Sequence, residues 1–238
     1  MATPSLLLLL ADGRFPAGAH AHSGGLEAAV AAGRVTDLAS LGAFLAGRLA
    51  TAGLVGAAFA AAAHRAAVAE TADSADPARS ARRSGALARL DAELDARTAA
   101  PALRAVSRRQ GRALLRAGRA VWPDAPFADL PATPGGAHQP LVLGLLCAAA
   151  GLSRVETATI AAYGTLTGAA SAGVRLLGLD PYQVQALLVG LADACDGTAA
   201  DAARAADDSP ERLPAAAAPL ADIHAEIHAT WEVRLFAS

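Results

Sequence analysis

Lysine is missing from this chain of 238 residues, and every basic side chain is an arginine. Without lysine the chain cannot carry the phosphate-binding pattern G-x-x-x-x-G-K-[ST], whose lysine contacts the nucleotide phosphates. We therefore expect no nucleotide hydrolysis of that type. The exclusive use of arginine fits a coding bias towards GC-rich codons better than selection for bidentate contacts.

Cysteine, aromatic and β-branched residues are also scarce. The two cysteines, Cys147 and Cys195, are isolated in apolar sequence, so no disulfide framework or C-x-x-C site is predicted and a reducing cytoplasm is expected. Aromatic residues make up only 4% of the chain, which leaves few rings to stack on nucleotide bases. Alanine dominates instead, and its high helix propensity predicts an all-α fold.

Long hydrophobic runs are absent as well. The run from Leu6 to Leu10 has no basic residue before it and is ended by Asp12, so it does not resemble a secretory signal. The other apolar runs, 54–63 and 140–152, are shorter than the roughly 20 residues that a membrane helix needs. We expect a soluble, cytoplasmic protein that does not enter a membrane.

Prolines and capping residues indicate where helices begin. Pro77, Pro101, Pro140 and Pro181 each stand where a first helical turn can start. The predicted N-caps are Asp37, Asp76, Asp180 and Ser153, the last in a capping box with Glu156. The predicted helices are 4–11, 23–33, 37–51, 54–72, 77–98, 101–121, 140–150, 153–171, 181–196 and 218–235, with loops at 123–139 and 196–218.

We find no internal repeat and no linker in the sequence. Residues 1–238 are therefore predicted to form one all-helical domain, a bundle of roughly ten helices. Segments 1–22 and 218–238 are candidates for ordering by partner proteins.

Positive charge is concentrated between residues 76 and 119, where eleven arginines accompany only four acidic residues. Helical spacing on 101–121 places arginines within one arc and apolar side chains opposite. This basic arc comprises Arg104, Arg108, Arg112, Arg116 and Arg119. A solvated face with local salt bridges is our first interpretation and an acidic protein partner the second. Nucleic acid is a distant third, because the net charge is −2 and no reader motif is present.

Histidine pairs are the weak candidates for metal ligands. His20 and His22 stand two apart in a loop, and His224 and His228 one turn apart on a predicted helix, so either pair could contact Ni²⁺ or Zn²⁺. No cysteine or further carboxylate at ligand spacing completes either set, so structural histidines are the favoured interpretation. The same helix carries an apolar stripe that indicates packing or an interface: Leu220, Ile223, Ile227, Trp231 and Leu235.

No arrangement for catalysis is visible in the sequence. Ser23 is the only hydroxyl near histidines in a glycine-rich loop, and neither a G-x-S-x-G elbow nor an orienting aspartate accompanies it. Helix capping explains Ser23 better. The residues alone therefore predict a scaffold or adaptor rather than an enzyme.

Four motifs in order along the chain carry a family resemblance. P-A-G-A-H-A-H-S-G-G-L-E starts at Pro16, R-Q-G-R-A-L-L at Arg109 and H-Q-P-L-V-L-G at His138, and the tail from Asp222 ends in R-L-F-A-S. Together they resemble the urease accessory protein F (UreF) family. The departures from its pattern are His20, His22, Gly24, Ala229 and Trp231, and the segment that starts at Arg109 is one residue shorter than the family's.

The resemblance implies a non-enzymatic urease maturation factor. Members form homodimers, dock accessory protein D (also called H) mainly through the C-terminal region, and recruit the nickel-carrying GTPase accessory protein G. The assembly delivers Ni²⁺ to apo-urease, so nickel is handled transiently and no cofactor is bound tightly.

On this basis, partner-binding residues are expected in three places. They are His228, Trp231, Arg234, Leu235 and Phe236 in the tail, Pro16, Gly18, Ser23, Gly25 and Glu27 in the N-terminal loop, and Arg112 and Arg116 on the basic arc. Two alternatives stay open. One is a helical metallochaperone that itself binds nickel, and the less favoured one is a helical nucleic-acid-binding protein.

Overall fold

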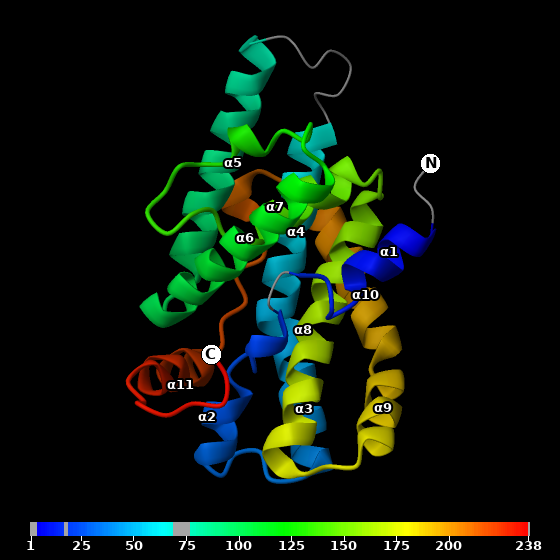
Figure 1. Cartoon of the computed structure of the whole chain (residues 1–238), viewed down its shortest axis with the longest axis vertical. Coiled ribbons are helices and arrows are strands. Elements are labelled where there is room, and N and C mark those ends of the chain that lie inside the picture. Colours follow the sequence, from blue (N-terminus) through cyan, green and yellow to red (C-terminus); the bar gives the residue numbers. More distant parts are fainter. Residues whose placement is uncertain (1–3, 17–18, 69–76, 238) are drawn as a thin grey trace.

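The computed structural model describes residues 4–16, 19–68 and 77–237, and this part of the chain contains helices and no strand, which confirms the all-α prediction (Figure 1). The α helices are α1 (Pro4–Ala11), α2 (Leu26–Ala31), α3 (Leu38–Arg48), α4 (Leu54–Val68), α5 (Pro77–Arg97), α6 (Pro101–Val121), α7 (Gln139–Ala149), α8 (Arg154–Leu177), α9 (Pro181–Gly190), α10 (Ala192–Ala205) and α11 (Pro219–Ala229). Short turns of 3₁₀ helix are η1 (Ala19–Ala21), η3 (Phe127–Asp129) and η4 (Pro210–Arg212), and η2 (Leu49–Gly53) is a π-helical turn.

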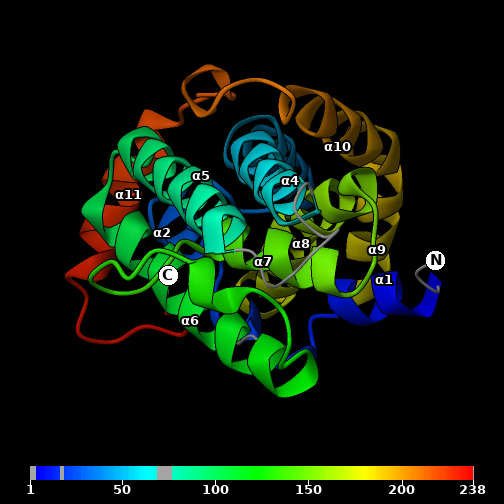
Figure 2. The same cartoon turned by 90° about the horizontal axis from the view of Figure 1, so that it is seen from above.

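Helix α4 is the centre of the fold, with α5, α7, α8 and α10 packed around it (Figure 2). All of its residues from 57 to 63 are buried, and six of these seven are alanines. Small side chains let a neighbouring backbone approach closely. At Gly144 of α7, an added Cβ would lie 2.7 Å from the backbone nitrogen of His64 and 2.8 Å from the Cβ of Ala63. The α4–α7 contact therefore requires both the alanines and this glycine.

Three of the predicted helix starts are confirmed. Asp37 and Ser153 each accept a hydrogen bond from the backbone N–H three residues later, within a capping box. Asp180 accepts one from the N–H two residues later, with proline as the next residue. Asp76 lies outside the described residues.

Several helix boundaries in the second half of the chain differ from the prediction. The helix expected at 153–171 continues to Leu177, and Gly178 ends it in the left-handed conformation (φ 63°). The helix expected at 181–196 is instead two, α9 and α10, which meet at Leu191. The loop predicted from residue 196 is helical as far as Ala205, because α10 buries one face, including Cys195, in the core. Tertiary packing of that face outweighs the poor helix propensity of its glycine and aspartates.

In the first half of the chain, the helix expected at 23–33 begins only at Leu26. Helix α3 ends at Arg48, close to the predicted end at residue 51, but η2 then joins it directly to α4. The predicted end of that next helix, at residues 69–72, lies outside the described residues.

The joined run Leu38–Val68 spans 31 residues and is long and apolar enough, by length and composition alone, to cross a membrane. The apolar run at 54–63, which is too short to span a membrane, is part of this longer helix. Its second half is α4, which lies buried among other helices of this chain. Only 28% of the most apolar window of the run is buried, but a single helix of this kind is weak evidence for a membrane, because core helices of soluble proteins pass the same test.

Candidate partner-binding site

The N-terminal loop turns sharply before α2. Gly24 and Gly25 have φ values of 64° and 89°, a left-handed conformation that glycine adopts without strain. Ser23 is buried, and its Oγ accepts a hydrogen bond of 3.2 Å from the backbone N–H of Glu27. The predicted cap thus acts on the first turn of α2. Of the other loop candidates, Pro16 is exposed and Gly18 lies outside the described residues.

Glu27 is the centre of the site, although it is buried. Its carboxylate accepts hydrogen bonds from the ring Nε2 of His228 at 2.9 Å, from the backbone N–H of Leu235 at 2.8 Å and from that of Phe236 at 3.0 Å. Burial pushes the pKa of Glu27 up, but the hydrogen bonds from Leu235, His228 and Phe236 together lower it below its usual 4.5. At neutral pH the carboxylate is charged and holds residues more than 200 positions away in sequence.

Phe236 anchors the tail to the rest of the chain. Its side chain is 4% exposed, and the guanidinium of Arg175 on α8 lies over its ring, 4.3 Å from the centroid. Arg175 also donates a hydrogen bond of 3.1 Å to the carbonyl of His20. The backbone N–H of Ala237 donates to the carbonyl of Ala21 at 2.7 Å. The tail and the N-terminal loop, two of the four motifs, are therefore one structural unit.

The predicted tail helix 218–235 is wrong beyond Ala229, where α11 ends. The following backbone is irregular because two of its N–H groups donate to Glu27 instead of to helix carbonyls. Trp231 and Leu235 therefore do not continue the apolar stripe. Trp231 packs beside His228 instead, with ring centroids 4.8 Å apart.

Large apolar side chains cover the outside of this fixed tail. Leu235 is 75% exposed and Val233 is 88% exposed, while Ile223 and Ile227 of α11 are half exposed. Arg234 is exposed among them. We call these five residues the loop–tail surface, which lies beside α2 at the side of the molecule where the C-terminus is found (Figure 1). Exposed large apolar side chains on neighbouring segments are typical of protein–protein contacts.

The histidine candidates do not converge on a metal ion. His228 is engaged with Glu27, His20 is exposed and His22 is half-buried. Burial, together with the charges of Arg109 and His20, lowers the pKa of His22. Within the described ranges, no three His, Cys, Asp or Glu side chains are grouped so that they could hold a metal. His224 lines an apolar cavity instead.

Part of the basic arc of α6 is occupied by contacts within the chain. Arg108 lies between two carboxylates of α5, 3.0 Å from Asp91 and 2.7 Å from Asp95. Arg112 donates a hydrogen bond to the carbonyl of Gly135. The interpretation as local salt bridges therefore holds at Arg108, whereas the side chain of Arg116 is exposed.

His138, the first residue of a sequence motif, belongs to the same network. The backbone N–H of this buried residue donates to Asp91 at 3.0 Å, and its ring nitrogens lie 2.9 Å from Ser107 Oγ and 3.1 Å from Asp95. It thereby joins the start of α7 to α5 and α6. Burial and the nearby charge of Arg108 lower its pKa, so the ring is neutral at neutral pH. These partners lie 31 to 47 positions away in sequence, so local sequence pattern does not indicate them.

The free energy of unfolding is expected to decrease as the pH falls below about 6.5, the usual histidine pKa. His22, His64 and His138 each have a lowered pKa, mainly through burial, so the unfolded chain binds protons that the folded chain does not. Their contribution is complete above pH 6.5 and is lost towards the folded pKa values. Urea unfolding at pH 7.5 and 5.5 measures this difference, and equal midpoints would contradict it.

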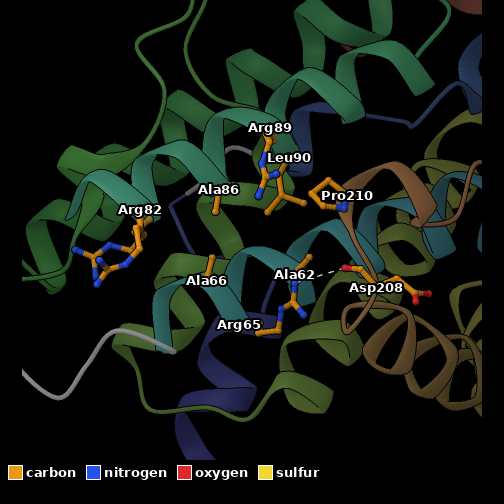
Figure 3. A pocket seen from close by; sticks show the side chains of 10 residues that line it. Ala62, Arg65, Ala66, Arg82, Ala86, Arg89, Leu90, Asp208 and Pro210 are labelled. Carbon is orange, nitrogen blue, oxygen red and sulfur yellow. Dashed lines mark hydrogen bonds between the residues drawn. The ribbon is translucent and has the colours of Figure 1, made fainter. Parts of the chain in front are cut away.

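A second concentration of arginines lies in a hollow of about 390 Å³ between α4, α5 and the segment that follows α10 (Figure 3). Arg65 donates a hydrogen bond of 3.0 Å to the carbonyl of Asp207 there, and Arg83 pairs with Asp129. Arg82 and Arg89 of α5 are exposed. Helix α5 thus presents positive charge as well as α6.

Comparisons with known proteins agree with one another. A model of the UreF family matches residues 35–192. The urease accessory protein UreF of Mycolicibacterium vanbaalenii is 43% identical over all 238 residues, and that of Mycobacterium marinum 44%, with both chains covered completely in each case. The protein of the same name in Mycobacterium tuberculosis is 43% identical over 202 residues, 85% of this chain and 86% of that protein. The full-length matches include the N-terminal loop and the tail, which lie outside the family model.

Proposed function

We propose that this chain, which belongs to the UreF family and so takes part in urease maturation, acts there as a non-enzymatic scaffold. In this role it forms a homodimer, binds accessory protein D and the nickel-carrying GTPase, and holds both on apo-urease while nickel is inserted. Nickel passes through the complex without being bound tightly by this chain.

The observation that carries the proposal is the loop–tail surface. Two sequence motifs at opposite ends of the chain meet around the buried Glu27, which fixes the backbone of Leu235 and Phe236. Leu235 nevertheless points its side chain into solvent. A surface that is already ordered loses little conformational entropy when a partner binds, so exposed apolar groups on it contribute efficiently to affinity. Accessory protein D is the partner that we assign to this surface.

Replacing Leu235 with aspartate should abolish or strongly weaken capture of accessory protein D without unfolding the chain. The side chain is 75% exposed, so the stability effect should be within about 0.5 kcal/mol. At an interface, burying one leucine is worth about 1.5–3 kcal/mol, and a carboxylate in its place adds a desolvation cost. The measurement is co-purification of tagged variants with accessory protein D, the GTPase and apo-urease, together with thermal melting.

Tyr182→Asp is the matched control, because Tyr182 is 86% exposed on α9, away from the tail (Figure 1). We expect it to capture accessory protein D normally. If Leu235→Asp captured accessory protein D as well as the wild type, the loop–tail surface would not be its binding site. Stoichiometric retention of nickel by the isolated wild-type chain would favour the metallochaperone instead.

The double variant Arg112→Glu with Arg116→Glu should weaken recruitment of the GTPase, if an acidic partner surface meets the basic arc. Long-range charge attraction is strongest at low salt, so the loss should be largest there. Arg204→Glu with Arg212→Glu makes the same change in net charge at exposed positions elsewhere. Equal recruitment by the two double variants at low salt would show that the arc is merely solvated.

A further inference from the structure

Beside the loop–tail surface lies a half-open, mainly apolar cavity of about 540 Å³, lined by residues of α3, α6, α11 and the N-terminal loop among others. Small-molecule sites in proteins usually have volumes of roughly 300–1,000 Å³ and mainly apolar walls with a few polar groups. The apolar wall here includes Phe44, Val55, Leu94, Leu103 and Val106. The cavity therefore has the size and lining of a site for a small organic molecule.

Two arginines of the wall, Arg34 and Arg48, have no carboxylate partner in the described ranges, and Arg48 is the less exposed of the two. Arg48, the last residue of α3, is not paired with a carboxylate anywhere in the described part of the chain. Its Nη1 donates to the carbonyl of Gly24, and its Nε is buried without any partner. Burial lowers the pKa of Arg48 to about 10, so the guanidinium is still charged at neutral pH. A buried charge without a partner is costly, and an anion that reaches it removes that cost.

The other charged wall residues do not neutralise Arg48. Arg97 is already paired with Glu93 and also donates to the carbonyl of Glu211 at 2.9 Å. Burial raises the pKa of Asp222, with a further contribution from Glu226, whereas an ion pair with Arg48 would lower it. The charge of Arg48 is therefore available to a ligand.

The loop holds the guanidinium at the cavity. A Cβ built on Gly24 would lie 2.9 Å from both Cζ and Nη2 of Arg48, so the guanidinium packs directly against the glycine backbone. The ring of Phe44 lies 6.0 Å from Cζ. The charged group is thus fixed between a loop and an aromatic ring. Its Nε is shielded from solvent, so a carboxylate in the cavity can accept from the terminal nitrogens of the guanidinium.

We propose that this cavity binds a small amphipathic carboxylate, one carboxylate group on an unbranched apolar body, with the carboxylate on Arg48 and the body against the apolar wall. Arg48 supplies a positive charge for the carboxylate, and the apolar part of the wall matches an aliphatic chain. Arg34, an exposed residue of the same wall, adds a second positive charge. The basic hollow of Figure 3 is a weaker candidate because its wall is less apolar and Arg83 already pairs with Asp129. The proposal does not depend on the role in urease maturation.

Isothermal titration of the full-length chain with hexanoate, octanoate and octan-1-ol tests the proposal. We expect one octanoate per chain and an affinity that rises about fourfold for each added methylene. Octan-1-ol, which lacks the charge, should bind at least about tenfold more weakly than octanoate. No detectable binding of either carboxylate, or equal binding of the alcohol, would overturn the proposal.

Arg48→Gln is the decisive variant, and it should bind octanoate at least about tenfold more weakly. Removing an unpaired buried charge should leave the melting temperature unchanged or raise it, so loss of folding is not expected. Arg119→Gln, an exposed change of the same charge on α6, should bind like the wild type. Gly56→Leu narrows the cavity from α4 while leaving Arg48 in place, and it should also weaken binding. Unchanged octanoate affinity in Arg48→Gln would contradict the assignment.

Discussion

Replacing Glu27 with leucine is expected to free the C-terminal tail and to lower the free energy of unfolding by about 3–5 kcal/mol. Leucine fills a similar volume but accepts no hydrogen bond. The ring of His228 and the backbone N–H groups of Leu235 and Phe236 would then lose a buried acceptor together. Hydrogen exchange of residues 231–237 and urea unfolding measure the two effects.

Glu232→Leu is the matched control for this variant. Glu232 is an exposed glutamate in the same tail, so its loss should leave both hydrogen exchange and stability close to the wild type. Glu27→Gln keeps one acceptor oxygen and should fall between leucine and glutamate. Unchanged protection of the Leu235 and Phe236 amides in Glu27→Leu would show that the carboxylate does not hold the tail.

Leu235 and Phe236 are neighbours in sequence but differ in solvent exposure, and this difference decides how experiments on the tail are interpreted. Phe236 is buried within the chain, whereas Leu235 is exposed. Deleting residues 230–238 would remove an internal contact of the fold and the exposed apolar surface at once. Lost capture of a partner by such a truncated chain could then reflect either change. The single exposed substitution at Leu235 separates binding from stability.

Gly144→Ala is expected to destabilise the chain by about 3 kcal/mol or more, and Gly144→Val to prevent folding. The new Cβ would collide with the Ala60 carbonyl, the His64 backbone nitrogen and the Ala63 Cβ, all in the central helix α4. Two of these obstacles are backbone atoms, which cannot rotate away as a flexible side chain can. Thermal melting by circular dichroism, with the soluble yield of each variant, measures the effect.

Gly164→Ala is the matched control, a glycine-to-alanine change in a helix that we expect not to destabilise the chain. A Cβ at Gly164 of α8 has no neighbouring atom within 4 Å, so alanine should be tolerated there. Removing a helical glycine stabilises by roughly 0.5–1 kcal/mol when nothing collides. If Gly144→Ala melted at or above the wild-type temperature, the close α4–α7 approach would not limit stability.

Local features of the fold could be predicted because they depend on neighbours in sequence. The caps at Asp37, Ser153 and Asp180 each act on residues two or three positions away, and all three are confirmed. The end of the tail helix could not be predicted. Periodicity favoured a helix to residue 235, but Glu27, 208 positions from Leu235, accepts the tail backbone hydrogen bonds instead.

The sequence predicts the two segments of the candidate site, but it does not predict that they contact each other. The motifs pointed to the loop and to the tail, yet sequence spacing cannot show that Glu27 and His228 are partners. The same limit applies to His138, whose carboxylate neighbours come from α5. Gly144, the last residue of the motif that starts at His138, is a further case. Its close contact depends on α4 lying opposite it in the fold. Such contacts follow from the tertiary packing of helices, which local propensity does not determine.

The pairing of Glu27 with residues 201 to 209 positions later also sets an order of events during protein synthesis. Chains fold progressively from the N-terminus as they are made. The N-terminal loop leaves the ribosome long before His228 and Phe236 exist, so its glutamate has none of these tail partners during that time. A chain interrupted before residue 236 carries the loop motif without the buried Phe236 that anchors the tail. Under the proposed function, binding of a partner at the loop–tail surface is thereby restricted to molecules whose synthesis has passed that point.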